Sequence, residues 1–404
     1  MESKIISSSV KFHFIALAAV GEGLSGGDRI FIELARRWSK SGHVIHIYTW
    51  QEGYNIIRAQ NLSGKNIHFH ILDLSVFPKF GFFVNYLTRI VVGIYLGLTL
   101  KIKNGGYVYS CSDFLMDSLP AWILKLRHPK IIWFAGWYQT APNPLKGYTE
   151  GSRKRAYHLT AFWYWLSQAF AKPPISKWAN FVLINNENEK VVFPRLSQLD
   201  RTVVVLGAVD VDSSLSFQKL HSQEKKMYDA LFVGRFHPQK GVLEMVEIWD
   251  KVTKVLPNAQ LGMIGDGELM PGVKAKIKQL KLVNNITLFG YVYDGPYKYE
   301  IFNQSKLVVH PAFYDSGGMF SAEAMVFGLP VVGFDLSSYA SYYPQGMLKI
   351  RVGDLEAMAQ TILKLLKDSS ARVKLGQQAK DMIVKNWSWD IRASQVLKRL
   401  IHDH

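Results

Sequence analysis

The stretch VVHPAFYDSGGMFSAEAMVFGLPVVGFD, from Val308 to Asp335, decides the fold. It begins with a short apolar run of the kind that forms a buried parallel strand, and it ends with a second such run, Val331 to Phe334. Between them the pattern predicts a loop and then an apolar helix from Phe320 to Phe327, which Gly328 and Pro330 end. Strand, helix and strand in this order are typical of a parallel α/β sheet.

The loop before this helix suits a ligand that has both a phosphate and hydroxyl groups. Gly317 and Gly318 let the backbone approach a ligand closely, and the helix that starts near Met319 offers N–H groups to an anion. Asp315 and Glu323 frame the glycines, and carboxylates can accept hydrogen bonds from hydroxyl groups.

This stretch resembles the acidic pair of retaining, family 4 type (group 1) glycosyltransferases of the GT-B fold. The family context E-A-M-x-x-G-x-P-V-V is matched from Glu323 to Val332, whereas the first acid, usually Glu, is the shorter Asp315. The resemblance implies that Asp315 contacts a sugar hydroxyl, that Glu323 binds the ribose, and that amides near Gly317–Met319 bind the β-phosphate or the sugar. The alternative is an ordinary strand-helix-strand unit with incidental acids.

A second motif, GRFHPQKG from Gly234 to Gly241, follows a predicted strand over Ala230 to Val233. Its two cations, Arg235 and Lys240, suit a diphosphate, and Gly241 permits a tight helix start. The motif resembles the donor-phosphate sequence G-R-x-x-x-x-K-G of the same family, which implies that the cations neutralise charge on the departing phosphate. The alternative is a pair of solvated cations. We expect Lys240→Ala to abolish transfer and to leave the fold intact.

Two glycine loops follow the next strands of this half, which we predict over Gln260 to Ile264 and Ile286 to Phe289. The loops contain Gly265 and the pair Gly290–Tyr291, and they resemble family segments that lie around the nucleotide base. The resemblance therefore places these three residues in the donor site.

In the first half of the chain, strands also alternate with helices, which predicts a second parallel, doubly wound sheet. We expect a helix over 28–41 and strands over Val10–Leu17, Val44–Tyr48, Ile67–Leu72, Gly106–Ser110, Lys130–Phe134 and Phe181–Ile184. The fold class is therefore α/β, and the resemblance implies two Rossmann-like domains facing across a cleft. The expected parts are an acceptor-side domain (1–208), a linker (209–228), a donor domain (229–386) and a helix that packs back on the first domain (387–404).

Gly21, Gly23 and Gly26 form the pattern G-x-G-x-x-G, which is typical of nicotinamide and flavin enzymes. No acid ends the second strand, where a dinucleotide ribose would need one. A dinucleotide enzyme stays an alternative. The resemblance instead implies that Gly26 and Gly27 open the first helix towards a nucleotide-sugar.

Many family members have a histidine, facing the donor sugar, after the strand equivalent to Ile131–Phe134. This chain has the sequence FAGWYQTAPN there and no histidine. We assign Trp137 or Tyr138 to the acceptor side instead, and the difference keeps open a non-catalytic, nucleotide-sugar-binding protein.

The chain has 404 residues, a formal net charge of +16 and one cysteine, Cys111, which excludes a disulfide within the chain and fits a reducing compartment. Basic charge favours nucleotides, nucleic acid or an anionic membrane surface as partners. The acids Asp210 and Asp212 could be taken for a metal-binding D-x-D, but their context resembles an interdomain linker, and we expect no metal and no cofactor.

Two segments are rich in apolar or aromatic residues. Phe80 to Leu100 contains Arg89, whose charge costs about 2.5–3.5 kcal/mol at the centre of a bilayer, so we favour a buried or membrane-surface helix over a spanning one. Lys146 to Lys177 interleaves basic and aromatic residues, which fits either a membrane-interface helix or a buried crossover helix.

The resemblance implies a retaining glycosyltransferase that moves a sugar from a nucleoside-diphosphate sugar to a hydroxyl of a glycan acceptor. Basic charge and aromatic helices favour a lipid-linked or membrane-proximal acceptor, reached from the cytoplasm or the inner face of the membrane. A transferase acting on another polyanion, such as DNA, is an alternative. Stacking of aromatics on single-stranded nucleic acid is disfavoured by a doubly wound scaffold.

Overall fold

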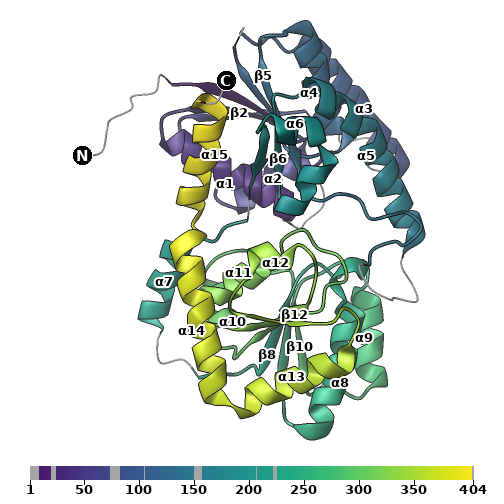
Figure 1. Cartoon of the computed structure of the whole chain (residues 1–404), viewed down its shortest axis with the longest axis vertical. Coiled ribbons are helices and arrows are strands. Elements are labelled where there is room, and N and C mark those ends of the chain that lie inside the picture. Colours follow the sequence, from purple (N-terminus) through teal and green to yellow (C-terminus); the bar gives the residue numbers. More distant parts are fainter. Residues whose placement is uncertain are drawn as a thin grey trace. The chain divides into compact units, whose positions relative to one another are not determined.

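The computed structural model describes residues 9–19, 24–72, 82–103, 105–149, 157–205, 207–221 and 225–402. The chain forms two compact units, each built around its own parallel sheet (Figure 1). Unit 1 comprises Met1–Ala141, Trp163–Val205 and Ala393–His404, and unit 2 comprises Pro142–Phe162 and Leu206–Arg392.

The sheet of unit 1 has seven parallel strands in the order β3-β2-β1-β4-β5-β6-β7. In its register, Ile15 lies opposite both Tyr48 and Ser110, so the strand order reverses between β1 and β4. The strands are β1 (Lys11–Ile15), β2 (Val44–Thr49), β3 (Ile67–Ile71), β4 (Tyr107–Ser110), β5 (Ile132–Trp137), β6 (Phe181–Ile184) and β7 (Thr202–Val204).

Helices cover both faces of this sheet. On one face, Trp38 of α1 (Gly26–Lys40) packs on Phe12 and Phe14 and donates a hydrogen bond to Ala393 O at 3.0 Å, in the part of α15 (Trp389–His402) that belongs to unit 1. The other face is covered by α3 (Phe82–Thr99), α4 (Leu115–Arg127) and α5 (His158–Trp178) (Figure 1). Two shorter helices are α2 (Gln51–Ala59) and α6 (Pro194–Gln198).

The sheet of unit 2 has six parallel strands in the order β10-β9-β8-β11-β12-β13, and this order reverses between β8 and β11. Val308 of β11 lies opposite Leu231 on one side and Val331 on the other. The strands are β8 (Ala230–Val233), β9 (Leu261–Ile264), β10 (Ile286–Gly290), β11 (Val308–His310), β12 (Val331–Phe334) and β13 (Met347–Ile350).

Successive residues of each strand point to opposite faces of the sheet, so β8 supplies two separate cores. Ala230 and Phe232 pack with α8 (Val242–Val255), α9 (Met270–Gln279) and α13 (Leu355–Lys367). Leu231 and Val233 pack with α10 (Pro296–Asn303), α11 (Met319–Met325) and α14 (Ser369–Asn386). Unit 2 also contains α7 (Val211–Leu220) and α12 (Tyr339–Tyr342).

The predicted doubly wound α/β class is confirmed, and each predicted strand is present with changed ends only. The stretch interpreted as linker-like contains a helix, α7, and the Asp210 side chain caps it by accepting hydrogen bonds from Ser213. The strands β7, of three residues, and β13, of four, were not predicted. Within the part of the chain that the structure describes, no helix is long and apolar enough to cross a membrane.

Candidate functional site

Most of the predicted donor residues lie where the strand order of unit 2 reverses. The chain continues from β8 to β9 on one side and from β11 to β12 on the other, which opens a crevice beyond their carboxyl ends. The loops that follow β8 and β11 touch: Gly241 has φ +64°, and a Cβ there would lie 1.9 Å from Pro311 O. Only glycine allows the two loops to approach this closely.

Lys240 and Asp315, both predicted for this site, form an ion pair across the two loops. Lys240 Nζ lies 2.5 Å from Asp315 Oδ2, and His310 Nε2 lies 3.1 Å from the same oxygen. The other carboxylate oxygen, Oδ1, accepts hydrogen bonds from Gly317 N at 3.2 Å and Gly318 N at 3.1 Å. One acid therefore organises both loops of the site, and it engages two amides that the sequence assigned to the phosphate or sugar.

Asp315 is ionised although it is buried. Burial by itself would raise the pKa of Asp315, but the charge of Lys240 and the hydrogen bond and charge of His310 outweigh this effect and hold the pKa well below its usual value. His310 was not predicted as a site residue. Its place at the end of a strand that borders the crevice was the available signal.

Glu323 of α11 is also held in a buried ion pair. Glu323 Oε2 lies 2.5 Å from Lys298 Nζ of α10, and Lys298 also contacts Asp294 Oδ1 at 2.9 Å. The Lys298 ammonium lies 5.2 Å from the centre of the Phe320 ring. Lys298 was not predicted, because in sequence it is an ordinary helical cation. The pair fixes the carboxylate that the resemblance assigns to the ribose.

The three predicted glycines Gly234, Gly265 and Gly290 lie side by side at the ends of β8, β9 and β10. Gly265 N donates to Gly290 O at 2.8 Å, and a Cβ on Gly265 would lie 1.9 Å from Gly234 O. Tyr291, next in the chain, is half-buried and packs edge-on against Tyr293 at a ring distance of 4.8 Å. Arg235, directly after Gly234, is exposed.

Tyr148 reaches the same motif from a distant part of the sequence. It is buried within unit 2, where its ring packs edge-on against His237 at 5.4 Å and lies 6.0 Å from the ring of Tyr314. Burial raises the pKa of the Tyr148 phenol to about 12, and the charge of Arg235 acts in the opposite direction. No local sequence signal could have found Tyr148, because it precedes the motif by a long stretch of chain.

Of the residues predicted in unit 1, Gly26, Gly27 and Tyr138 lie at the start of α1. Gly26 is the first residue of α1, and its N-cap, Ser25, forms a capping box with Asp28. The Ser25 hydroxyl therefore accepts a hydrogen bond from one of the N–H groups of the first turn, that of Asp28. Gly21 and Gly23, the other glycines of the G-x-G-x-x-G pattern, lie outside the described residues.

Trp137 and Tyr138, predicted for the acceptor side, both lie in the interior of unit 1. Trp137 Nε1 donates to Thr140 Oγ1 at 2.9 Å, and the Tyr138 hydroxyl hydrogen-bonds the Tyr109 hydroxyl. Tyr138 also lies beside Gly27, where an added Cβ would be 3.3 Å from the Tyr138 ring. Both rings therefore pack inside unit 1: Trp137 lies against Phe193, and Tyr138 lies beside Gly27.

The end of β1 is held by two side chains, Asp117 and Arg89, that were not predicted as site residues. Asp117 accepts hydrogen bonds from Leu17 N at 2.6 Å and Ala18 N at 3.0 Å, and Arg89 donates to Leu17 O at 2.9 Å. Burial raises the pKa of Asp117 to about 8. The loop that leads towards α1 therefore starts from a fixed position.

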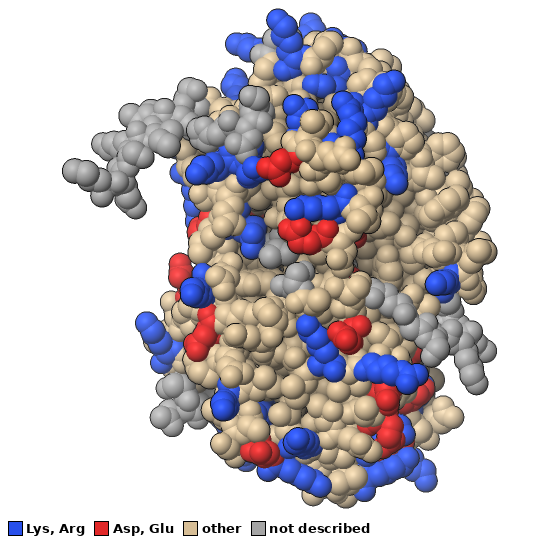
Figure 2. Space-filling view, in the orientation of Figure 1, with Lys and Arg blue, Asp and Glu red and all other residues tan. Residues whose placement is uncertain are grey.

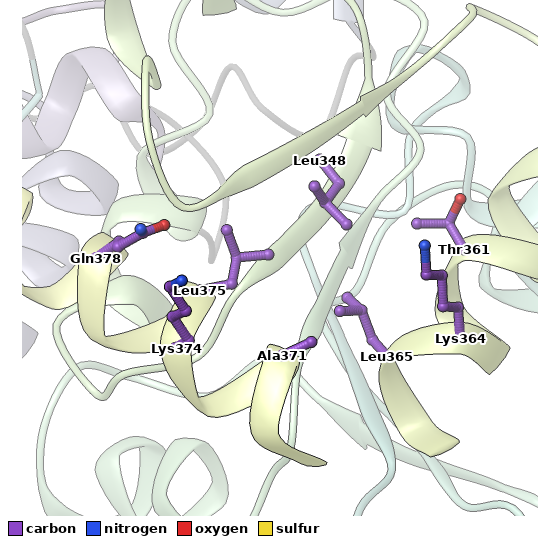
Figure 3. A pocket seen from close by; sticks show the side chains of 8 residues that line it. All are labelled: Leu348, Thr361, Lys364, Leu365, Ala371, Lys374, Leu375 and Gln378. Carbon is purple, nitrogen blue, oxygen red and sulfur yellow. The ribbon is translucent and has the colours of Figure 1, made fainter. Parts of the chain in front are cut away.

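Two further observations define the limits of the site. Among the described residues, no group of three or more His, Cys, Asp or Glu side chains is arranged to hold a metal ion. A cavity of about 300 Å³ lies between β13, α13 and α14, and none of the predicted site residues lines it (Figure 3).

Residues 213–382 match the model of the family "Glycosyl transferases group 1". This segment, somewhat less than half of the chain, is similar to the group 1 glycosyl transferases. The matched segment contains both motifs described above, including Arg235, Lys240, Asp315 and Glu323.

Two curated glycosyltransferases match part of this chain. The poly(glycerol-phosphate) alpha-glucosyltransferase of Bacillus subtilis is 29% identical over 190 residues, which is 44% of this chain and 28% of the relative. The phosphatidyl-myo-inositol mannosyltransferase of Mycobacterium leprae is 27% identical over 203 residues, which is 48% of this chain and 52% of the relative. The chain thus spans about half or less of the length of these curated relatives.

The solved structure of Anabaena Alr3699/HepE in complex with UDP and glucose is similar over 97% of this chain and 100% of that one. The TM-score is 0.70 at 13% sequence identity. At such low identity the likeness concerns the fold alone: this chain has the GT-B fold of two Rossmann-like domains.

Proposed function

We propose that this chain is a retaining glycosyltransferase. It would move a sugar from a nucleoside-diphosphate sugar to a hydroxyl of a phosphate-rich acceptor that is lipid-linked or membrane-proximal. The observation that carries the proposal is the meeting of Lys240, Asp315 and His310 at the crevice of unit 2, with Arg235 on the neighbouring loop. The match of residues 213–382 to the glycosyl transferase group 1 model and the UDP complex of the structural relative support it.

In the proposed reaction, the bond between the sugar C1 and the β-phosphate oxygen breaks, and the acceptor oxygen forms a bond to C1 on the same face. The transition state carries positive charge on the sugar and growing negative charge on the diphosphate. Arg235 and Lys240 stabilise that negative charge, which lowers the barrier because the cations are already in place. The acceptor hydroxyl gives its proton to the departing phosphate.

The ion pair between Lys240 and Asp315 gives this chemistry a definite starting state. When a diphosphate enters, Lys240 gains a second anionic neighbour and can share its donors between the phosphate and Asp315. The carboxylate, still held by the Gly317 and Gly318 amides, accepts a hydrogen bond from a sugar hydroxyl. When the donor binds, Lys240 and Asp315 thus exchange some of their hydrogen bonds for bonds to the donor, and neither buried charge is left without a partner.

The acceptor class rests on the names of the relatives and on charge. One relative is named for poly(glycerol-phosphate) and another for phosphatidyl-myo-inositol, and both names describe phosphate-containing acceptors. The net charge of +16 favours such a polyanion over a neutral glycan.

A second candidate function is nucleotide-sugar binding without transfer. It is favoured by the loop after β5, where Thr140 N donates to Glu189 Oε1 at 3.1 Å and no histidine is present in 134–143. The two functions differ in turnover, since a binding protein would retain its donor unchanged with every acceptor offered.

The first test is thermal unfolding with UDP, GDP, ADP or NAD, each alone at millimolar concentration. A ligand at a hundred times its dissociation constant adds about 2.7 kcal/mol of stability, which is readily measured. We expect one nucleoside diphosphate to raise the unfolding temperature and Arg235→Ala to remove that shift. Lys251→Ala, which removes a surface cation of the same unit, is the control that should keep it.

Donor turnover with a poly(glycerol-phosphate) or lipid acceptor, followed by NMR of the anomeric proton of the product, then tests transfer and retention. An inverted anomer would exclude the retaining mechanism. Donor binding without any turnover would favour the second candidate. A shift with NAD alone would overturn both.

A further inference from the structure

Helix α3 (Phe82–Thr99) has its charge inside and its apolar residues outside. Its one charged residue, Arg89, is 2% exposed and donates to Leu17 O and to Glu52 Oε2, each at 2.9 Å. Five apolar or aromatic residues of the same helix are between 39% and 66% exposed: Val84, Leu87, Val91, Tyr95 and Leu98. Their spacing of three or four residues places them on one face of the helix.

The opposite face of α3 is fixed against α4. An added Cβ at Gly97 would lie 3.0 Å from Pro120 Cα, and one at Gly93 would lie 2.9 Å from Met116 O. These close contacts, together with the bonds of Arg89, prevent α3 from rotating to bury its apolar stripe. The exposed stripe is therefore a feature of the folded unit.

Helix α5 extends this surface. The Tyr86 hydroxyl of α3 lies 3.0 Å from Ser167 Oγ of α5, so the two helices are neighbours. The part of α5 that belongs to unit 1 adds two exposed aromatic residues that lie seven positions apart on one face of the helix, Trp163 and Phe170. These two residues and the five of α3 are together called the α3–α5 surface. Figure 2 shows few charged side chains on the visible surface over α3 and α5.

The two segments that carry the α3–α5 surface have charge of one sign; the acid that binds Arg89, Glu52, belongs to α2. Residues 74–112 and 151–186, which contain the two helices, include no Asp or Glu. Exposed lysines are present instead: Lys101 and Lys103 directly follow α3, and Lys172 lies in α5. An apolar face with tryptophan and tyrosine, bordered by lysines and free of acids, is complementary to the headgroup region of an anionic bilayer. A protein partner would require no such one-sided charge.

We propose that unit 1 binds an anionic lipid bilayer through the α3–α5 surface, with α3 lying in the plane of the headgroups. The apolar side chains enter the boundary between headgroups and acyl chains, and the lysines contact lipid phosphates. This inference stands on exposure and charge alone and does not depend on the proposed reaction. A protein that fails to transfer sugar can still bind vesicles, and the converse also holds.

The test is flotation of the full chain with vesicles of equal parts phosphatidylglycerol and phosphatidylcholine, compared with vesicles of phosphatidylcholine alone. We expect binding to the first and at least about tenfold weaker binding to the second. The double variant Leu87→Ser with Val91→Ser should lower binding to the anionic vesicles about tenfold or more, since it removes two large apolar groups from the contact.

The matched control is Leu220→Ser with Val373→Ser, which changes the same residue types at similarly exposed positions of unit 2. It should bind like the unaltered chain. Circular dichroism of both variants checks that they fold, and a folded Leu87/Val91 variant with unchanged binding would overturn the proposal. Lys101→Ala with Lys103→Ala should weaken binding about fivefold per lysine and reduce its dependence on salt.

Two other results would also overturn it. If the unaltered chain binds neither kind of vesicle, the surface does not contact lipid. If, without lipid, the chain forms a dimer that Leu87→Ser with Val91→Ser dissociates, and vesicle binding is absent, the surface joins two copies of the chain.

Discussion

Lys240 Nζ and Asp315 Oδ2 lie 2.5 Å apart although the two residues are 75 positions apart in the sequence. Each belongs to one of the two motifs that resemble glycosyltransferase donor motifs, so the ion pair joins the motifs into one site. It also makes the cation expected to stabilise the leaving diphosphate part of the folded structure. A change at Lys240 should therefore affect both the stability of the fold and the proposed activity.

Lys240→Ala should reduce transfer about 100- to 1,000-fold, because it removes a preorganised cation from the departing phosphate. It should also lower the free energy of unfolding by about 3–5 kcal/mol, since Asp315 remains buried without its main counter-charge. The sequence alone led us to expect an intact fold, and the structure changes that expectation. Urea unfolding and initial rates measure the two effects.

Arg235→Ala separates the two effects, because Arg235 is exposed and its loss exposes no buried charge. We expect a comparable loss of transfer with an unfolding free energy within about 0.5 kcal/mol of the unaltered chain. If Lys240→Ala were as stable as Arg235→Ala, the ion pair would contribute little to folding.

Gly241→Ala should disrupt the same site through the backbone. The substitution combines a left-handed φ of +64° with a Cβ placed 1.9 Å from Pro311 O, so the loops after β8 and β11 must separate. We expect a loss of stability of several kcal/mol (about 3 or more) and loss of the nucleotide-dependent thermal shift. Gly328→Ala is the matched control, because Gly328 has φ +72° and nothing within 4 Å of an added Cβ. It should cost only about 1 kcal/mol.

That the two motifs meet could be predicted because each motif is a local pattern that follows a strand. Gly234, Arg235 and Lys240 follow one strand and Asp315 follows another, and the parallel pattern brings such strand ends together. Their partners could not be read in the same way. Lys298 is separated from Glu323 by 25 positions, and only the packing of α10 on α11 buries it.

The difficult cases in unit 1 have a similar cause. The apolar pattern of Phe80 to Leu100 predicts a helix, but it is apolar on nearly every side and cannot indicate which side is buried. The structure shows that the buried side is the one that carries Arg89. Trp137 and Tyr138 follow an apolar strand and could have lined a site, but β5 continues to Trp137 and both rings pack inward.

The pair of Glu323 and Lys298 allows a double-mutant cycle. Lys298→Met alone leaves the buried Glu323 charge without its partner and should lower the free energy of unfolding by about 3–5 kcal/mol. Glu323→Gln alone should cost less, because Lys298 keeps its contact with Asp294. The double variant leaves neither charge and should lose clearly less than the sum of the two. Additive losses would show that the two charges do not interact energetically. If Glu323 binds the ribose, as proposed, Glu323→Gln should also raise KM for the donor more than it lowers kcat.

A row of histidines on one face of the unit 1 sheet predicts how stability depends on pH. His13 of β1 stacks on His46 of β2 at 5.1 Å, and His46 Nδ1 lies 3.0 Å from His70 Nε2 of β3. His68 stacks on His46 from the other side at 5.0 Å. Burial, reinforced by the neighbouring histidines and by Lys11, lowers the pKa of both His13 and His46 to about 4.

In the unfolded chain these histidines take up protons near pH 6.5, whereas in the folded chain they remain neutral down to about pH 4. Between these values the unfolded state binds more protons, so the free energy of unfolding falls as the pH falls from 6.5 to 4 and is unaffected above that window. Because both side chains keep some contact with water, we expect a loss of about 2 kcal/mol, less than two full shifts would give. His46→Gln removes one of the two groups and also removes a neighbour that lowers the pKa of His13. The free energies of unfolding measured with urea at pH 7 and pH 5 should therefore differ by about 1 kcal/mol less than in the unaltered chain. His128→Gln, in the same unit but outside this row, should keep the original difference between pH 7 and pH 5. If His46→Gln also keeps that difference, groups other than these histidines cause the pH dependence.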